Sequence, residues 1–342
     1  MTTVAPKPTP TLQDVARMAG VSTATVSRCL NAPDKVVAAT RDKVNAAVQV
    51  LGYSPHFGAR VMAARRTNTI GAVIPTMENA IFARGLQAFQ EELRASGFTL
   101  LVASSNYDRT TEEDQIRALI ARGADALMLI GTDRSDAIYD LLDAQQLPVL
   151  TAWTSDTVRG HAAVGFDNRA AMKALAAKAL AFGHKRLGLI SAPTATNDRA
   201  RQRLEGLRDA MAQAGLDPAS LAIVERPYGI ANGADGFDAL MNHAAPPTAI
   251  LCGNDVLAVG ALHRARLKGI DVPGVVSITG FDDIELAAVA VPPLTTIHVP
   301  DAEMGRAAAR ALVAMVRVDD RPGPLTLPTT LRLRGSLGPV PA

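Results

Sequence analysis

Short apolar runs alternate with amphipathic stretches along most of the chain, from residue 68 to about residue 296. Nine runs have the length and composition of strands, at 69–74, 98–104, 126–131, 148–153, 161–167, 186–191, 222–227, 249–254 and 276–283. Helical stretches follow the first three at roughly 82–95, 111–122 and 134–145. Near-continuous apolar strands separated by such helices are typical of a parallel sheet covered on both faces. The pattern therefore predicts an α/β body of two doubly wound parallel sheets, because it repeats twice and one lobe is too small for the whole length.

The first 55 residues show short helical stripes instead of strands. A first helix begins at Thr11, an N-cap candidate with Asp14 three residues later, and its apolar stripe is Leu12, Val15, Ala16 and Ala19. Gly20 allows a tight turn after it, and Ser22 can cap a second helix. A third helix follows at about 38–50. The pattern predicts an all-α helix-turn-helix unit, a motif whose second helix enters the major groove of DNA.

The second predicted helix carries side chains suited to DNA on its outward face, because Val26 and Leu30 turn inward. Thr23 and Ala24 are small enough to let the helix approach base edges, and Arg28 can reach guanine or phosphate. Serine and threonine hydroxyls on the same helix can contact phosphates. An ordinary helical hairpin without a nucleic acid partner is the alternative interpretation.

Charge separates this N-terminal part from the rest of the chain. Residues 1–66 hold nine Lys and Arg against three Asp, a net charge of +6. The remaining residues hold 26 basic and 30 acidic side chains, a net charge of −4. A basic small end on an acidic body favours contact of that end with a polyanion. A basic, solvated tail without a partner is the alternative.

Composition limits the compartment and the chemistry. The first eleven residues hold three prolines and no apolar core, and no apolar stretch reaches the ~18 residues of a membrane helix. Cys29 and Cys252 lie far apart in the sequence, without a Cys or His at metal spacing. We therefore expect reduced thiols, no metal and no other cofactor. Together these features predict a protein of the cytoplasm, associated with the nucleoid and not with a membrane.

The N-terminal unit resembles the headpiece of the lac repressor family almost position for position, over the stretch TLQDVARMAGVSTATVSRCLNAPDKVVAATRDKVNAAVQVLGYSPH. The resemblance implies that Thr23 and Ala24 read bases, with Arg28 as a third base contact. It further implies that five residues hold the phosphate backbone: Thr11, Ser22, Thr25, Ser27 and Asn31.

The next stretch, HFGARVMAARRTNT, resembles the hinge helix of the same family. In relatives this helix folds only on operator DNA, and a pair of leucines wedges into the minor groove. Met62 occupies that leucine position and Ala59 fits the pattern around it. Methionine is apolar and can still act as a wedge between base steps. A plain basic linker is the alternative interpretation of residues 56–66.

Polar and aromatic residues follow several of the predicted strands. In doubly wound sheets, ligands bind outside the carboxyl ends of the strands, and those positions hold Trp153, Asp167-Asn168, Asn254-Asp255 and Asp282-Asp283. Arg201 and Arg203 begin the helix after the strand at 186–191. This set suits a hydroxylated or acidic small molecule beside an aromatic wall. For Asp167-Asn168 and Asp255, a helix cap without a ligand is the alternative.

The body also resembles the lac repressor family, over landmarks that include GHKRLGLISAP, RLEGLRDAM, PTAILCGNDVLAVGAL and VSITGFDD. The resemblance implies two lobes like those of periplasmic sugar-binding proteins, which close on a ligand. It also implies an effector site of Phe82, Trp153, Arg203, Tyr228, Asn254 and Asp282.

Two departures bear on the effector. Trp153 replaces an acidic residue of many sugar-binding members, and with VGFDN after it the region resembles the gluconate-responsive branch. The arginines suit a carboxylate, whereas Asp282 adds an anion that this branch often lacks. A sugar acid is therefore preferred, and a neutral sugar stays open.

These expectations divide the chain into five parts. They are a disordered tail (1–10), the headpiece (11–55), the hinge helix and linker (56–67), a first lobe (68–164 with 297–324) and a second lobe (165–296 with 325–342). The expected protein is a transcriptional regulator, most simply a repressor, controlled by a small-molecule effector. A homodimer is expected, because the C-terminus lacks the leucine heptads that make the lac repressor a tetramer, and a dimer suits a pseudo-palindromic operator.

Two other function classes fit the sequence less well. An enzyme is disfavoured because G-x-G-x-x-G, G-x-S-x-G, H-E-x-x-H and paired-cysteine motifs are missing, and the six histidines are scattered. A solute-binding protein fits the body alone. The basic headpiece and the missing signal peptide argue against that class.

Overall fold

The structure, a computed structural model, describes residues 9–54, 66–78, 81–318 and 320–341. The chain forms two compact units, Met1–Thr67 and Asn68–Ala342. No helix among the described residues has the length and apolar character needed to cross a membrane.

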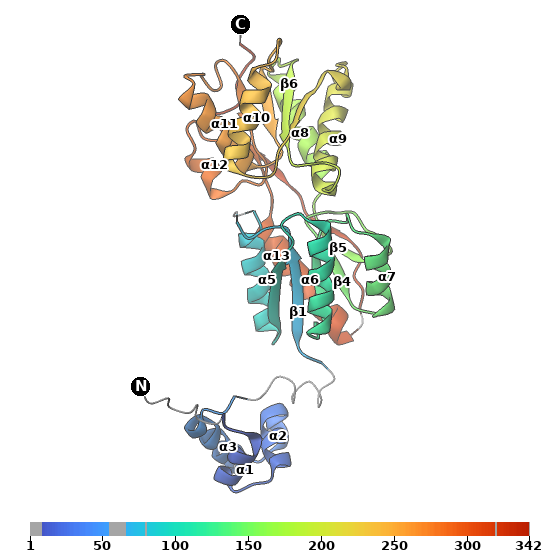
Figure 1. The fold of residues 1–342 in the computed structure, drawn as a ribbon, viewed down its shortest axis with the longest axis vertical. Helices are drawn as coiled ribbons and strands as arrows, with labels where there is room; N and C mark the ends of the chain where they lie inside the picture. Colours follow the sequence, from blue (N-terminus) through green and yellow to red (C-terminus); the bar gives the residue numbers. More distant parts are fainter. Residues whose placement is uncertain (1–8, 55–65, 79–80, 319, 342) are drawn as a thin grey trace, which may run out of the picture. The chain divides into compact units, whose positions relative to one another are not determined.

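The described residues of the smaller unit form three helices, drawn in blue in Figure 1: α1 (Leu12–Ala19), α2 (Thr23–Asn31) and α3 (Ala38–Leu51), with a 3₁₀ turn at Pro33–Lys35. The predicted capping box is present, since the backbone N–H of Thr11 donates to Asp14 Oδ2 at 2.9 Å and Thr11 Oγ1 accepts from the Asp14 N–H at 3.3 Å. Gly20 adopts φ 69°, the left-handed conformation that ends α1. One apolar cluster joins the three helices, with Val15, Ala16, Val26, Cys29, Val44, Ala47 and Tyr53 buried in it.

The larger unit begins with a six-stranded parallel sheet in the order β11-β5-β4-β3-β1-β2. Its strands are β1 (Thr69–Ile74), β2 (Thr99–Ser104), β3 (Ala126–Ile130), β4 (Val149–Ala152), β5 (Ala162–Gly165) and β11 (Leu325–Thr326). Side chains of α5 (Ala83–Ala95) and α13 (Asp301–Val318) bury one face. Those of α6 (Arg109–Ala121) and α7 (Asp136–Ala144) bury the other face. We call this assembly the first lobe (Figure 1).

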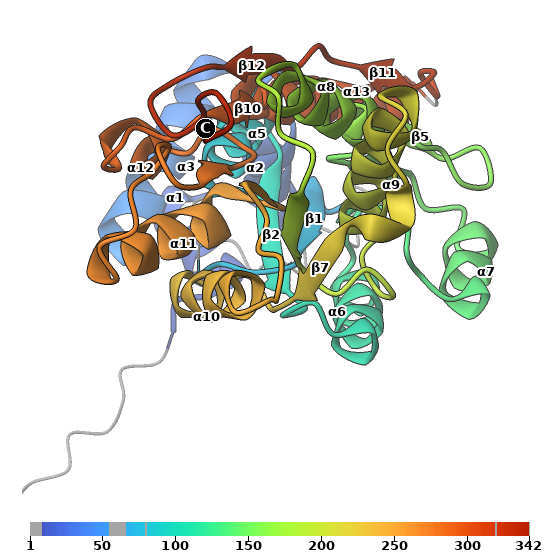
Figure 2. The ribbon, with the colours of Figure 1, turned by 90° about the horizontal axis from the view of Figure 1, so that it is seen from above.

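The second lobe is built on a four-stranded parallel sheet in the order β7-β6-β8-β9. Its strands are β6 (Leu187–Ser191), β7 (Ala222–Glu225), β8 (Ala249–Cys252) and β9 (Ser277–Thr279). One face is covered by α8 (Asn168–Ala181) and α9 (Asp198–Gln213), and the other by α10 (Ile230–Met241) and α11 (Asp255–Leu267) (Figure 2). A 3₁₀ turn (Pro218–Ser220) and the short α12 (Glu285–Val289) complete it. All nine predicted strands are confirmed, each as a segment within or equal to the predicted run.

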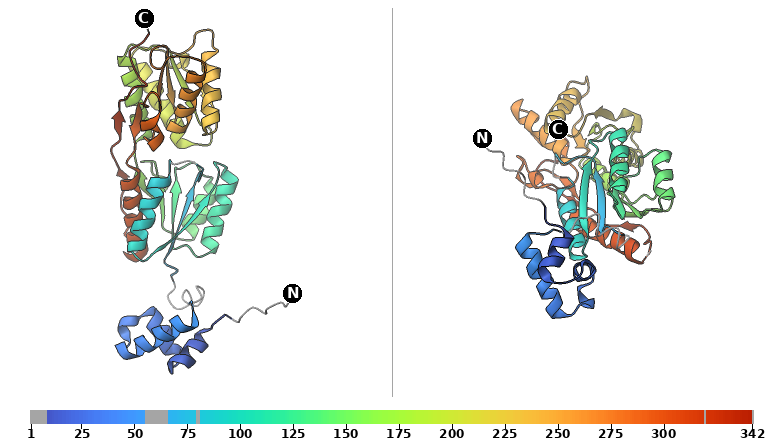
Figure 3. Two further views of the ribbon diagram at one scale, coloured as in Figure 1. Left: turned by 90° about the vertical axis from the view of Figure 1, so that its left-hand side faces the viewer. Right: turned by 60° about the horizontal axis from the view of Figure 1, so that its bottom comes forward.

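The C-terminal part of the chain passes between the lobes (Figure 3). It forms β10 (Thr296–His298) and β12 (Thr330–Arg332), an antiparallel pair that the apolar pattern did not predict. The expected second lobe includes residues 325–342. Leu325 and Thr326 instead form β11, which pairs with β5 in the first sheet, so the chain passes back to the second lobe after Thr326. These strands are only two or three residues long, which is too short for a recognisable period.

Candidate nucleic-acid interface and ligand cleft

The outward face of α2 carries the residues predicted to read bases. Thr23, Ala24 and Arg28 are all exposed, while Val26 on the opposite side is fully buried. Ala24 and Arg28 share one face because residues four positions apart on a helix lie close together, and Thr23 adjoins Ala24 at the start of α2. The local fold therefore presents this set to solvent as a unit.

Three of the five predicted backbone-contacting residues, Thr11, Ser22 and Thr25, lie at the N-terminal ends of α1 and α2. Thr11 and Ser22 are exposed caps, and the backbone N–H of Thr25 donates to Ser22 Oγ at 3.1 Å. A helix N-terminus favours a phosphate, because its free N–H groups and its dipole both attract an anion. Ser27 is half-buried on α2. Ala59, Met62 and the side chain of Asn31 lie outside the described residues.

A cavity between the two lobes is lined by all six predicted effector residues: Phe82, Trp153, Arg203, Tyr228, Asn254 and Asp282. Phe82 precedes α5 and Trp153 follows β4 in the first lobe. Tyr228, Asn254 and Asp282 follow β7, β8 and β9 in the second lobe. They meet because the carboxyl ends of parallel strands share one edge of each sheet, and these edges face each other across the cavity. We call this cavity the cleft.

Arg203 is a buried cation held in a fixed position. It is 6% exposed, and its Nε donates to Asn168 Oδ1 at 2.9 Å. Nη1 donates to the Gly253 carbonyl oxygen, and the Phe281 ring lies 4.1 Å below the guanidinium carbon. A guanidinium fixed on these sides is preorganised, so little side-chain entropy is lost when it binds a ligand.

On the second-lobe side of the cleft, Asn254 Nδ2 and Asp282 Oδ2 are buried polar atoms without a hydrogen-bond partner among the described residues. Asn254 caps α11, because its Oδ1 accepts from the Leu257 N–H at 2.9 Å, which leaves its amide NH₂ for another partner. Asp282 has φ 106°, a costly backbone conformation for an aspartate. Buried polar atoms are nearly always paired in folded proteins, so these two atoms are available to a polar partner in the cleft.

An aromatic wall closes the first-lobe side of the cleft. The rings of Phe82 and Trp153 meet edge to face with centroids 5.2 Å apart. A Cβ at Gly85 would lie 2.7 Å from the Trp153 ring, so only glycine lets α5 approach this closely. Asn168 Nδ2 donates to the Trp153 carbonyl oxygen at 3.0 Å, which fixes the turn after β4.

Four further residues line the cleft without having been predicted: Ile81, Tyr107, Asn197 and Arg199. Tyr107 follows β2, where the strand-end rule could have found it, and its ring lies 5.4 Å from that of Tyr228. Burial raises the pKa of both tyrosine hydroxyls, so they stay protonated and can donate. Arg199 stands four residues before Arg203, a helical spacing that places both on one face of α9.

Other residues from the sequence analysis have structural roles. Arg201 points away from the cleft and forms a two-bond ion pair with Asp133 of the first lobe, at 2.8 and 3.1 Å. Asp167 caps α8 by accepting from the Ala170 N–H at 2.8 Å. Asp255 accepts from Thr296 Oγ1 at 2.6 Å and from the Ile284 N–H at 2.8 Å. For Asp167 and Asp255 the interpretation without a ligand is therefore favoured. The described residues contain no group of three or more His, Cys, Asp or Glu that could hold a metal ion.

Replacing Asp282 by asparagine is expected to stabilise the protein more at pH 8 than at pH 5. Burial raises the pKa of Asp282 to about 7, although Arg203, Arg199 and Arg84 oppose the shift. The folded state therefore binds this proton more tightly than the unfolded state, so its contribution to stability is lost as the pH rises through about 7. That loss amounts to a few kcal/mol, and an amide, which does not titrate, avoids it.

Thermal unfolding of Asp282→Asn and the parent protein at matched pH values measures this difference. The charge of Asp282 also raises the pKa of the buried acids Asp301 and Asp255, so the measured difference includes their response to the loss of that charge. A gain in Tm that does not change with pH contradicts the assignment of the proton to Asp282.

Comparisons with known proteins identify the same two parts of the chain, the small helical unit and the two-lobed body. Residues 11–56 match the model of bacterial regulatory proteins of the lacI family, and residues 176–337 match a periplasmic binding protein-like domain. The HTH-type transcriptional regulator GntR of Pseudomonas aeruginosa is 33% identical over 308 residues, which cover 90% of this chain and 89% of that protein.

Solved structures show the same similarity. A LacI family transcriptional regulator from Silicibacter pomeroyi superimposes with a TM-score of 0.87 at 27% identity, covering 96% of this chain and 99% of that one. The lac repressor dimer bound to operator and an anti-inducer gives a TM-score of 0.85 at 26% identity, covering 97% and 100%. The chain therefore belongs to the lacI family of bacterial regulatory proteins and is a transcriptional regulator, not an enzyme.

Proposed function

We propose that the protein is a repressor that binds a pseudo-palindromic operator as a homodimer and responds to a sugar acid, such as gluconate, bound in the cleft. The observation that carries this proposal is the convergence of six predicted residues on one cavity, with two buried arginines and unpartnered polar atoms beside them. The effector changes operator affinity by the coupling free energy between the two sites.

The proposed DNA contacts follow the exposed face of α2. Thr23, Ala24 and Arg28 read base edges, and the caps Thr11 and Ser22 hold phosphates together with Thr25, Ser27 and Asn31. Residues 56–67 form the hinge, where Met62 wedges into the minor groove beside Ala59. The five-part division of the chain given above, with the return to the second lobe after Thr326, belongs to the same proposal.

Exposed apolar side chains support a homodimer. Met77 is 61% exposed beside the half-exposed edge strand β2, and Val289 and Val291 are 73% and 71% exposed in the second lobe. Burying exposed apolar side chains against a partner surface gains free energy. A two-fold dimer also matches a palindromic operator, and the similar lac repressor was solved as a dimer on its operator.

The charge of the cleft favours a sugar acid over a neutral sugar. Arg199 and Arg203 are 7% and 6% exposed, and both line the cleft. Asp198 pairs with Arg199 at 3.0 Å, whereas burial raises the pKa of the Asp282 carboxyl that faces Arg203 to about 7, so protonation of Asp282 leaves Arg203 without a compensating charge. A ligand carboxylate supplies the missing negative charge, and the hydroxyls of an aldonate match Asn254 Nδ2 and Asp282 Oδ2. The similar Pseudomonas protein is named GntR.

A thermal-shift screen of the purified protein against aldonates, matched neutral sugars and nucleobases tests the effector class. We expect D-gluconate at a hundred times its Kd to raise the Tm by about 5 °C, and to change operator binding in a fluorescence anisotropy assay. The matched neutral sugar D-glucose is the control and should shift the Tm by less than 1 °C. Stabilisation by a neutral sugar or a nucleobase, without stabilisation by any aldonate, would falsify the assigned class.

A further inference from the structure

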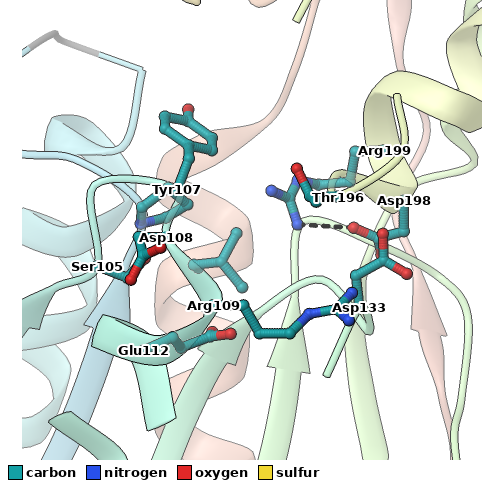
Figure 4. Close-up of a pocket in the computed structure, with 11 residues that line it drawn as sticks. Ser105, Tyr107, Asp108, Arg109, Glu112, Asp133, Thr196, Asp198 and Arg199 are labelled. Carbon is teal, nitrogen blue, oxygen red and sulfur yellow. Dashed lines mark hydrogen bonds and ion pairs between the residues drawn. The ribbon is translucent and has the colours of Figure 1, made fainter. Parts of the chain in front are cut away.

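Arg199 lies between the cleft and the contact that joins the two lobes. It stands on the first turn of α9 and lines both the cleft and a neighbouring polar pocket (Figure 4). Its Nη1 donates to Asp198 Oδ1 at 3.0 Å, and the two side chains are 9% and 6% exposed. Asp198 is the one hydrogen-bond partner of Arg199 among the described residues.

Asp198 continues this connection into the first lobe. Its second oxygen, Oδ2, accepts from the backbone N–H of Thr132 at 2.7 Å and from Thr132 Oγ1 at 3.0 Å. Burial alone raises the pKa of Asp198, but Arg199 and the two Thr132 donors outweigh it and hold the pKa below its usual range. Asp198 is therefore a carboxylate at neutral pH, and both of its oxygens are engaged.

The backbone of the first lobe also confines the Arg199 guanidinium. A Cβ at Gly131 would lie 1.8 Å from Arg199 Nη1, and Gly131 has φ 70°, a conformation that favours glycine. The guanidinium of a second-lobe residue thus packs directly on the first-lobe backbone. This packing exists only when the lobes approach each other, so the position of Arg199 depends on closure.

The two cleft arginines differ in which guanidinium N–H donors remain available to a ligand. Arg203 is bound through Nε and Nη1 to its own lobe, and it lowers the pKa of Asp282 more than any other group does. Arg199 uses Nη1 alone, which leaves the Nε and Nη2 donors for another acceptor. A carboxylate can accept two parallel bonds from such a guanidinium edge.

We propose that Arg199 selects the carboxylate of the ligand and transmits its binding to the lobe contact through Asp198 and Thr132. This inference rests on the proposed function and names the residue that decides between an acid and a neutral sugar. A ligand carboxylate on Arg199 completes a continuous chain of hydrogen bonds from the ligand to the first lobe. A neutral ligand leaves that chain without its charged end, so it closes the lobes less effectively.

Calorimetric Kd values for D-gluconate and D-glucitol test the selection, since glucitol is gluconate with the carboxylate reduced to CH₂OH. For Arg199→Gln we expect gluconate to bind about 30-fold more weakly and glucitol to change by less than about threefold. The matched control is Arg201→Gln, two residues along α9, which breaks the ion pair with Asp133 but does not line the cleft. It should weaken both ligands by the same factor and leave their ratio unchanged.

The transmission is tested by a double-mutant cycle of Arg199→Gln with Thr132→Val on gluconate affinity. We expect the combined loss to be smaller than the product of the single losses, because both substitutions interrupt one chain. Arg199→Lys, which keeps the charge without the two-bond edge, serves if the glutamine variant does not fold, and it should lose part of the selectivity. Independent losses in the cycle contradict transmission through Asp198.

The outcomes separate this inference from the proposed function. If the parent protein binds gluconate and Arg199→Gln keeps its preference over glucitol, the role of Arg199 is wrong and the effector assignment stands. If the parent protein binds a neutral sugar better than any aldonate, the assigned effector class and the role of Arg199 are both wrong. The assignment of the protein as an operator-binding regulator is not affected by that result.

Discussion

Arg203→Ala is expected to weaken effector binding about 100-fold while leaving operator affinity without effector within about twofold. The substitution removes a buried cation that orients the ligand and leaves Asn168 Oδ1 and the Gly253 carbonyl oxygen without their donor. Truncating one partner of a buried, hydrogen-bonded charge typically costs a few kcal/mol, and each 1.4 kcal/mol is a factor of ten in Kd. The stability of the second lobe should fall as well, so the Kd, and not the Tm, is the measurement that decides.

Arg208→Ala is the matched control for this substitution. Arg208 lies five residues later on α9 and forms an exposed i,i+3 ion pair with Glu205 at 2.9 Å, outside the cleft. Pairs of this kind contribute little to stability, so effector affinity should stay within about twofold. An Arg203→Ala protein that binds gluconate as tightly as the parent protein removes Arg203 from the effector site.

The sequence predicted the fold well wherever the signal was local. Each apolar run that became a strand, and the Thr11 cap with its Asp14 partner, depends on residues within one element. The cleft residues followed from a topological rule, because the carboxyl ends of parallel strands converge whatever the loops contain. Phe82 and Tyr228 came from the family resemblance alone, whereas Arg203 was also singled out at the start of the helix that follows the strand at 186–191.

The parts that escaped prediction depend on partners far away in the chain. Arg201 and Arg199 look equivalent in the sequence, and their difference appears only when Asp133 and Gly131 of the first lobe are in place. β10 and β12 are formed by pairing between residues about thirty positions apart, without a periodic pattern of their own. The double role of Asn254, a helix cap through Oδ1 with a free amide NH₂, likewise requires the coordinates.

Removing residues 1–67 is expected to abolish operator binding and to leave effector affinity within about twofold. The chain separates into compact units at this boundary, and every residue that lines the cleft lies in the second unit. The first unit holds α2 with its exposed Thr23, Ala24 and Arg28. The loss of operator affinity should be at least about 10³-fold, which is the usual gap between specific and nonspecific binding.

Charge strengthens the expectation for the truncated body. Residues 1–66 carry a net charge of +6, whereas the rest of the chain carries −4 and repels the phosphate backbone. The truncated protein should therefore show no binding to operator DNA in an anisotropy titration, even at low salt, where nonspecific contacts are strongest. Calorimetry with gluconate on the same sample supplies the control that the cleft is intact. Specific operator binding by residues 68–342 would mean that the acidic body contains a DNA site of its own, and it would overturn the assignment of base reading to α2.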